Sequence, residues 1–379
     1  MASSDIAIGI GSTHLCTYAY VLHRPTSRMY SSVGPALNRH AIQDNEFTSR
    51  LLKIFTSLHQ DAARDGNDLR RQRANVVISL PGVALPGQQK GALLCCHSVF
   101  RPSLFEVTVL DDTWASLFAE TLDINGISAI AGVGASVCIA QDGFQLDEDF
   151  KIDGWGPVIG DFGSAFDISV QYFRGLNRKK DATPSEACSI FPLIKNEFSR
   201  TPFRMTSPVN IQNWSDGVAA SVGSEWRAVF SRTARAIAHA ADVPIAPIPE
   251  AVDLIIDAAN AFSHTITLAV ERARSFGMRP ARVVLHGELC FWSSLYVTRV
   301  ATAVRDSTNV DVVFSRFGPA LGAFLWACAG STERTLGRGY IALNPYLPRE
   351  SPEVLSDLRS RAVALHSPTE GSGRLVTHA

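Results

Sequence analysis

The chain has 379 residues, of which 46% are hydrophobic and 19% charged, with a net charge of -1 and a pI of about 6.8. The composition excludes a largely disordered chain, and the length exceeds what one hydrophobic core usually supports, so we expect two domains. The near-neutral charge gives no electrostatic reason to expect a nucleic acid or an anionic membrane as partner. Because no secretory signal and no apolar run of about 18 residues is present, we expect a cytoplasmic protein.

The first predicted element is a β-hairpin over residues 5–22, whose turn is the run Gly9-Ile10-Gly11-Ser12-Thr13. Residues 31–38 are predicted as a loop or a short third strand. Apolar residues at helical spacing predict a helix over residues 45–63. The elements expected next are strands over residues 75–80 and 105–110 and a helix over residues 112–122.

A second strand, glycine turn and strand follow over residues 127–140, with the turn at Gly132-Val133-Gly134-Ala135. This internal repeat of the N-terminal pattern indicates a duplicated architecture. We therefore predict an N-terminal domain over residues 1–120, a C-terminal domain over residues 121–345 and a tail over residues 346–379. The later elements expected are helices within residues 216–241 and over 249–276, strands over 282–285 and 310–314, a helix over 318–329, and an exposed helix over 352–362 followed by disorder.

The densest glycine cluster lies at residues 154–163, where four glycines accompany Trp155 and Asp161 immediately before a predicted helix. Glycines gather where the backbone turns sharply or approaches a ligand, and a helix start offers N–H groups to anions. This pattern predicts a binding site, and the alternative is a surface turn without a ligand.

The repeated units and glycine turns resemble the actin, Hsp70 and sugar kinase fold, and the sequence resembles the N-acetylglucosamine kinase branch of the BadF/BadG/BcrA/BcrD-type ATPase family. Residues 154–168 follow the family pattern GGWGxxxGDxGSAxxI, with Asp153 in place of the first glycine. Residues 318–323 resemble the start of the last helix in the family, and Gly287 lies where its adenosine-side glycine is expected. The resemblance covers residues 5–330 and implies an α/β, actin-like (ribonuclease H-like) fold of duplicated domains with an interdomain cleft.

The resemblance also implies a site for a small-molecule substrate, an amino sugar. Asn38 matches the residue that binds the sugar ring, and Asp112 matches the general base that accepts a proton from the attacking hydroxyl. An alternative for Asp112 is a helix N-cap, and the alternative for Trp155 is a core aromatic. The residues that would line the rest of the sugar site are Gly154, Trp155, Asp161 and Ala165.

The cofactors implied by the resemblance are ATP and magnesium, with Asp112 and Asp161 as candidate magnesium ligands. The expected nucleotide contacts are Gly11, Ser12, Thr13, Gly132, Gly134 and Gly287. Several residues depart from the family pattern on this side. Gly9 replaces an acid, Ile10 replaces a glycine, and Val133 and Ala135 replace two hydroxyl residues that would bond to phosphate. Restoring the first turn by Gly9→Asp with Ile10→Gly is expected to raise nucleotide affinity.

Three functions are compatible with these residues. The first is ATP-dependent phosphorylation of an amino sugar or a related hydroxylated molecule. The second is a catalytically silent family member, a possible pseudoenzyme, that acts as a ligand sensor or regulator. The third is an ATP-independent acid–base enzyme that uses the same cleft. Because members of the family often dimerise, the resemblance also suggests a homodimer.

Cysteine and histidine chemistry is not expected to contribute. The seven cysteines lack CxxC spacing, which argues against disulfides, a zinc site and the iron–sulfur branch of the broader family. His14, His264 and His286 are interpreted as structural or surface residues.

Overall fold

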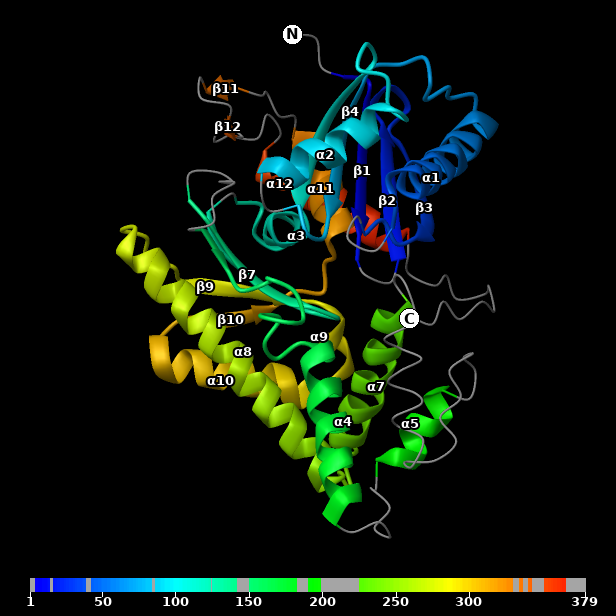
Figure 1. Ribbon diagram of the computed structural model, residues 1–379. Helices are drawn as coiled ribbons and strands as arrows, with labels where there is room; N and C mark the ends of the chain where they lie inside the picture. The colour runs from blue at the N-terminus through cyan, green and yellow to red at the C-terminus, as the bar shows by residue number, and fades with distance from the viewer. Residues whose placement is uncertain are drawn as a thin grey trace. The chain divides into compact units, whose positions relative to one another are not determined.

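The computed structural model describes residues 4–13, 16–38, 42–83, 86–123, 125–141, 150–182, 190–198, 225–329, 334–336, 340–342 and 351–365. The chain divides into two compact units, each built around one five-stranded sheet (Figure 1). Unit 1 comprises residues 1–126, 140–150 and 315–379, and unit 2 comprises residues 127–139 and 151–314. The units are therefore not consecutive segments, because the chain returns to unit 1 after residue 314.

The sheet of unit 1 has the strand order β3-β2-β1-β4-β5. Its strands are β1 (Ile6–Ser12), β2 (Cys16–His23), β3 (Arg28–Pro35), β4 (Ala74–Leu80) and β5 (Phe105–Asp111). β1 pairs antiparallel with β2, which pairs antiparallel with β3, whereas β1, β4 and β5 are parallel. As a result β1, β3, β4 and β5 all run in one direction, and their carboxyl ends lie at the same end of the sheet.

Helices cover both faces of this sheet (Figure 1). α1 (Asp44–Arg64) packs on β2 and β3, and α2 (Pro86–His97) packs on β5. α11 (Pro319–Ala329) packs on β1 and β4 and also contacts α3 (Asp112–Thr121). A short 3-10 helix, η1 (Arg24–Thr26), follows β2.

The predicted hairpin is confirmed, but its predicted turn at residues 9–13 is wrong, because β1 continues through Ser12. Gly9 and Gly11 face α11 instead of turning the chain. A Cβ on Gly9 would lie 2.1 Å from Cα of Phe324, and one on Gly11 would lie 2.2 Å from the backbone N of Ala320. Glycine is required at both positions because the helix backbone approaches the strand so closely.

Ile10 points to the other face of β1. Its side chain is fully buried in the core cluster that also contains Leu51 and Ile54 of α1. The isoleucine that replaces a glycine of the family pattern is therefore a core residue. Alternation along the strand directs the isoleucine into the core and the two glycines toward α11.

Most other predictions in unit 1 are confirmed within a few residues. Residues 28–35 form a strand, and the helix predicted over residues 45–63 is α1. α2 was missed by the sequence reasoning, since no strong apolar periodicity marks it. β11 (Arg334–Leu336) and β12 (Tyr340–Ala342) pair antiparallel near the end of the chain.

The sheet of unit 2 has the order β10-β9-β6-β7-β8. Its strands are β6 (Gly126–Ala131), β7 (Ala135–Ala140), β8 (Lys151–Ile152), β9 (Arg282–His286) and β10 (Asp311–Phe314). β6, β9 and β10 are parallel, and the predicted glycine turn connects β6 to β7. The segments that follow Ala131 and His286 therefore leave the sheet at the same end.

The helices of unit 2 are α4 (Ala165–Ala182), α5 (Phe191–Phe198), α7 (Glu225–Ala241), α8 (Pro249–Ser275), α9 (Glu288–Trp292) and α10 (Ser294–Thr308). α8 packs against α4, α7 and α10, as Figure 1 shows. α7 and α8 confirm the two predicted long helices, although residues 216–224 lie outside the described part of the chain. α5, α9 and α10 were not predicted.

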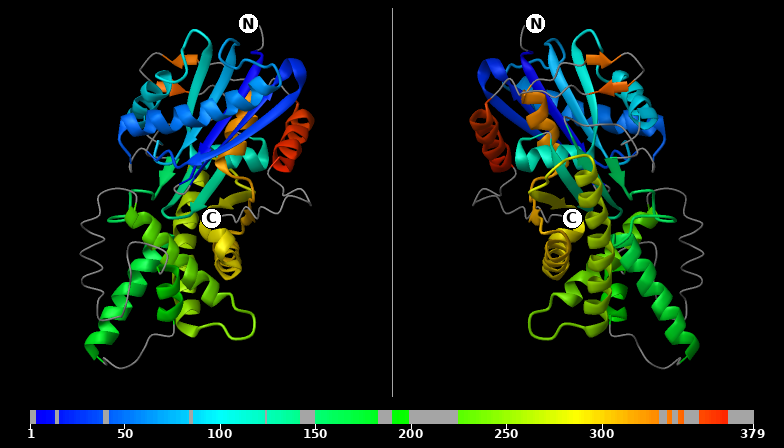
Figure 2. Two further views of the ribbon diagram at one scale, coloured as in Figure 1. Left: turned by 90° about the vertical axis from the view of Figure 1, so that its right-hand side faces the viewer. Right: turned by 90° about the vertical axis from the view of Figure 1, so that its left-hand side faces the viewer.

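α12 (Pro352–Ala364) confirms the helix predicted near the C-terminus, but the expectation that it is exposed is wrong for one face. Leu355, Leu358 and Ala362 are buried, and the helix packs against α11 in unit 1 (Figure 2). Arg359 donates to the carbonyl oxygens of Ala119 and Glu120. The disorder predicted beyond this helix falls on residues outside the described ranges.

Within the described ranges, no helix combines the length and apolar character needed to cross a membrane.

Candidate functional site

The carboxyl end of the unit 1 sheet gathers the residues predicted for the sugar and its base. Ser12 ends β1, Pro35 ends β3 and Asp111 ends β5, and the strand register aligns these three ends. Thr13, Asn38 and Asp112 follow directly, so they lie at one end of the sheet. Carboxyl ends of parallel strands are where α/β folds commonly bind ligands.

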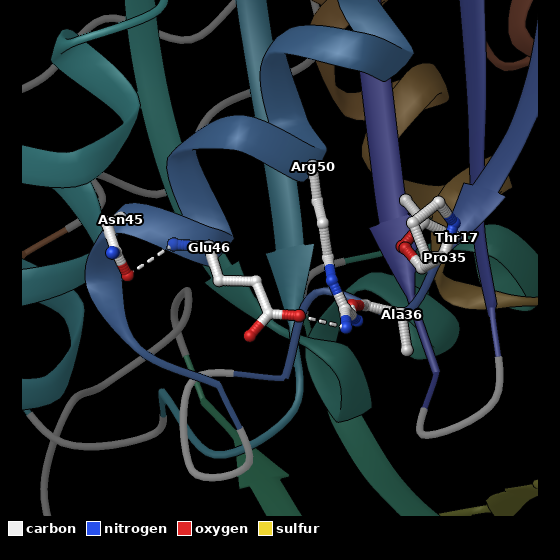
Figure 3. A network of polar contacts seen from close by, with 6 residues as sticks. All are labelled: Thr17, Pro35, Ala36, Asn45, Glu46 and Arg50. Carbon is white, nitrogen blue, oxygen red and sulfur yellow. Dashed lines mark hydrogen bonds and ion pairs between the residues drawn. The ribbon is translucent and has the colours of Figure 1, made fainter.

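A buried hydrogen-bond network fixes the loop that carries Asn38. The Ser12 hydroxyl accepts from the Leu37 N–H at 2.7 Å and from the Thr17 hydroxyl at 3.1 Å. The Thr17 hydroxyl is also 2.8 Å from the Pro35 carbonyl oxygen, and Arg50 donates to the Ala36 carbonyl oxygen at 2.7 Å. Figure 3 shows the Arg50 side chain beside Ala36. Ser12 is fully buried in this network, so its hydroxyl orders the loop over residues 35–38.

Asn38 itself is 3% exposed, and its backbone carbonyl oxygen accepts from the Ile42 N–H at 3.1 Å. Arg50 extends the network outward, because it also forms an ion pair with Glu46 one helical turn earlier (Figure 3). These contacts hold the loop from residue 35 to residue 38 against the start of α1. The amide side chain is therefore placed by a preorganised backbone.

Two adjacent aspartates at the start of α3 have different roles. Asp111 is the N-cap: it is buried, and its carboxylate accepts from the Thr113 N–H at 3.1 Å and from the Thr113 hydroxyl. Asp112 is the first helical residue and is half-buried. The N-cap alternative for Asp112 is therefore wrong, since the preceding residue performs that function.

The glycine-rich segment of unit 2 is a loop closed by Asp153. The Asp153 carboxylate accepts from the N–H groups of Gly154 at 2.7 Å, Asp161 at 2.8 Å and Phe162 at 3.0 Å. Asp153 and Asp161 both adopt positive φ angles, 62° and 59°. Sequence reasoning noted Asp153 only as a departure from the family pattern, and its acceptor role became visible only with the folded loop.

The start of α4 is held by the second glycine turn. The N–H groups of Ala165 and Phe166 donate to the carbonyl oxygens of Gly132 and Val133, at 2.9 and 3.2 Å. The Asp167 N–H donates to the Ser164 hydroxyl at 3.2 Å. The expectation that this helix start offers its N–H groups to anions is therefore wrong, because intramolecular acceptors occupy them.

Two side chains of the loop are at least partly exposed. Trp155 is 45% exposed, which excludes the core-aromatic alternative, and the Lys151 ammonium lies 5.0 Å from its ring centroid. Asp161 places a carboxylate oxygen 2.9 Å from where a Cβ on Gly134 would lie. The loop thus presents an aromatic face and a carboxylate, which are suited to the faces and hydroxyls of a sugar ring.

The second glycine turn also contacts the predicted adenosine-side glycine. Gly287 has a φ of 114°, and a Cβ there would lie 2.3 Å from the Ala131 carbonyl oxygen. A carboxylate oxygen of Glu288 lies 2.2 Å from where a Cβ on Gly132 would lie. Unit 2 therefore brings together Gly132, Gly134, Asp161, Ala165 and Gly287, and adds Glu288, which the sequence reasoning missed.

His286 and Cys290, which lie close to Gly287 in the chain, are both uncharged. Burial lowers the pKa of His286 to about 3, so its imidazole is neutral at physiological pH. Burial and the charge of Glu288 raise the pKa of the Cys290 thiol. Neither group supplies a positive charge that would attract a phosphate.

The turn nevertheless retains donors for an anion. Among the residues that the structure describes, the Val133 and Gly134 N–H groups have no hydrogen-bond acceptor, whereas the Gly132 N–H bonds to the Gly134 carbonyl oxygen. Val133 and Ala135 are each 3% exposed, so their side chains pack inward. Adjacent backbone N–H groups suit a phosphate oxygen. The described ranges contain no cluster of three or more metal-ligating side chains.

Comparisons with known proteins establish the fold. No family model matches the sequence, and no curated protein matches it. A crystal structure of a candidate N-acetylglucosamine kinase from Chromobacterium violaceum has a TM-score of 0.60 and 18% identity, covering 86% of this chain and 99% of that chain. A second such candidate, from Porphyromonas gingivalis, has a TM-score of 0.55 and 17% identity, and the match covers 84% of this chain and 98% of that chain. The predicted α/β, actin-like fold of duplicated domains is confirmed.

Proposed function

We propose that this chain transfers a phosphoryl group to a hydroxyl of an amino sugar or a related small hydroxylated molecule. Asp112 is the general base, and Asn38 binds the acceptor. The observation that carries the proposal is the arrangement at the carboxyl end of the unit 1 sheet, where Asp111 caps α3 and Asp112 is spared that role. A carboxylate at hydrogen-bond reach of the acceptor hydroxyl suffices for this chemistry, because phosphoryl transfer depends mainly on positioning and charge stabilisation.

Within unit 2, the loop over residues 153–163 carries further candidate contacts for a sugar. The Trp155 ring packs on an apolar face of the sugar, and the Asp161 carboxylate accepts hydrogen bonds from its hydroxyls. Gly154 and Ala165 lie at the two ends of the same loop. The three Asp153 hydrogen bonds support this role, because they hold the Asp161 backbone in place.

ATP with magnesium is the phosphoryl donor in this proposal, and it supplies the γ-phosphoryl group when bound. The Val133 and Gly134 N–H groups would hold phosphate oxygens, and Gly287 would lie beside adenosine. Asp112 and Asp161 are the candidate magnesium ligands. The contributions of this chain are to orient the acceptor through Asn38 and Trp155 and to take its hydroxyl proton at the Asp112 carboxylate.

A second candidate function is a catalytically silent sugar sensor, and one observation favours it. The turn that would hold phosphates contacts the Glu288 carboxylate and has lost two hydroxyl residues relative to the family pattern. Such a protein would bind the sugar without turnover. The two functions share the acceptor residues and differ in the use of a nucleotide.

The proposal is tested by replacing the base. We expect Asp112→Asn to reduce phosphorylation of N-acetylglucosamine by magnesium ATP at least about 100-fold, since general base catalysis contributes roughly 10²–10⁴-fold. Mass spectrometry of the product and isothermal titration with the sugar are the measurements. Sugar affinity should remain within about tenfold, because the amide keeps the size of the carboxylate.

Glu120→Gln, at the other end of the same helix, is the matched control and should retain full activity. An Asp112→Asn variant as active as the wild type would exclude Asp112 as the base. Sugar binding without any product in the wild type would instead favour the sensor.

A further inference from the structure

Glu288 lies directly against the turn that is proposed to hold phosphate. It follows Gly287 at the start of α9, and its carboxylate oxygen lies 2.2 Å from where a Cβ on Gly132 would be. The Val133 N–H is on the next residue. A phosphate held by this turn would therefore lie beside a carboxylate.

The surroundings of the turn add negative charge. Asp161 contacts Gly134 on the other side, so the two glycines of the turn are flanked by two different carboxylates. His286 precedes Gly287 and is 4% exposed, and Cys290, two residues after Glu288 in α9, is 5% exposed. Both are neutral, as their burial requires. Negative charges that lie close together repel strongly where water is partly excluded.

We infer that Glu288 sets the nucleotide affinity of this chain by electrostatic repulsion, so that the turn between β6 and β7 binds nucleotide phosphates weakly. The inference rests on the proposed function, since it concerns the donor site of the same reaction. It assigns Glu288 a specificity-determining role, because repulsion penalises polyphosphates and leaves uncharged ligands unaffected.

Isothermal titration with magnesium ATP, inorganic tripolyphosphate and adenosine tests this role. Glu288→Gln removes the charge and keeps the shape, and we expect it to bind magnesium ATP and tripolyphosphate at least about tenfold more tightly than the wild type. Affinity for adenosine, which carries no phosphate, should stay the same. Added potassium chloride should reduce the gain, because salt screens the repulsion.

Two further variants complete the design. Glu271→Gln removes an exposed carboxylate from α8 and should leave all three affinities unchanged. Glu288→Ser tests the charge with a smaller side chain and should also raise phosphate affinity, provided that circular dichroism shows an intact fold.

Each outcome either supports or overturns the inference. Weaker magnesium ATP binding by Glu288→Gln would mean that the carboxylate assists binding, and equal gains for adenosine would indicate a steric effect. Failure of wild type and variants alike to bind nucleotide or tripolyphosphate would also overturn it. Tighter binding without any sugar phosphate formed would uphold the role of Glu288 and refute the proposed kinase activity alone.

Discussion

At the residue scale, the start of α3 shows how neighbouring identical side chains acquire different functions. Asp111 points back to the Thr113 N–H as the N-cap, while Asp112 has entered the helix. A sequence pattern predicts that one of them caps the helix, but the choice depends on where β5 ends. The strand register fixes that end at Asp111, and the proposal for Asp112 depends on this one-residue difference.

His286 gives a pH dependence of stability. Its pKa is about 3 in the folded chain because it is buried, against 6.5 when exposed. Below pH 6.5 the unfolded chain therefore binds a proton at His286 that the folded chain does not. The free energy of unfolding is consequently not reduced by His286 above pH 6.5, and it falls as the pH decreases from 6.5 toward 3. We expect a loss of about 1.4 kcal/mol per pH unit in this window.

Urea unfolding of wild type and His286→Phe at pH 7 and pH 5 measures this loss. The variant should lose less stability on acidification than the wild type. His239→Gln, which replaces an exposed histidine of α7, is the control. Identical pH dependence in wild type and His286→Phe would show that the buried imidazole is not responsible.

At the element scale, contact between α11 and β1 explains the glycines that sequence reasoning assigned to a phosphate turn. Gly9 and Gly11 let the helix backbone approach the strand, and Gly322 does the same where α11 meets α3. Restoring an acid at Gly9 is therefore not a route to nucleotide binding. The side chain would be directed into the helix backbone.

We expect Gly9→Asp to lower the free energy of unfolding by about 3 kcal/mol or more, since it overpacks a buried contact and buries a charge. Urea denaturation followed by circular dichroism is the measurement. Gly87→Asp is the control, because a Cβ at Gly87 meets no atom within 4 Å. A Gly9→Asp variant of normal stability with raised nucleotide affinity would restore the original interpretation.

Elements with a strong one-sided apolar pattern were predictable, and those without it were not. α1 and α8 bury apolar residues at helical spacing, and both were predicted within two residues of their observed ends. The sequence pattern predicted neither α10 nor the very short α9 that precedes it. Its start depends on Asp242, which accepts from Ser293 and Ser294 some fifty residues away in the sequence.

At the scale of the whole molecule, α12, the last described element, belongs to the same unit as β1, the first. α12 packs on α11 and bonds to the end of α3 through Arg359, while Arg361 donates to the Ser27 carbonyl oxygen. A tail that composition suggested to be peripheral therefore contributes a buried face to the N-terminal unit.

Removal of α12 tests that contribution. A chain ending at residue 350 should be less stable by about 3 kcal/mol or more, because two buried leucines and the arginine hydrogen bonds are lost. Urea unfolding of this chain is compared with that of a chain ending at residue 365. Equal stabilities would show that α12 adds nothing to unit 1.

The homodimer expected from the resemblance stays a prediction, which analytical ultracentrifugation of the same samples would test.

The sequence by itself determined the α/β class, the strand pair β1 and β2, the turn between β6 and β7 and the glycine-rich loop before α4, because periodicity and glycine clusters are local properties of the chain. Only the tertiary structure decided that Gly9 and Gly11 serve helix packing, that Asp153 closes the loop, and that Glu288 contacts Gly132. Each of these facts concerns a partner distant in the sequence. A local pattern shows which backbone conformations are favoured, whereas the packing of the folded chain selects the atoms that meet.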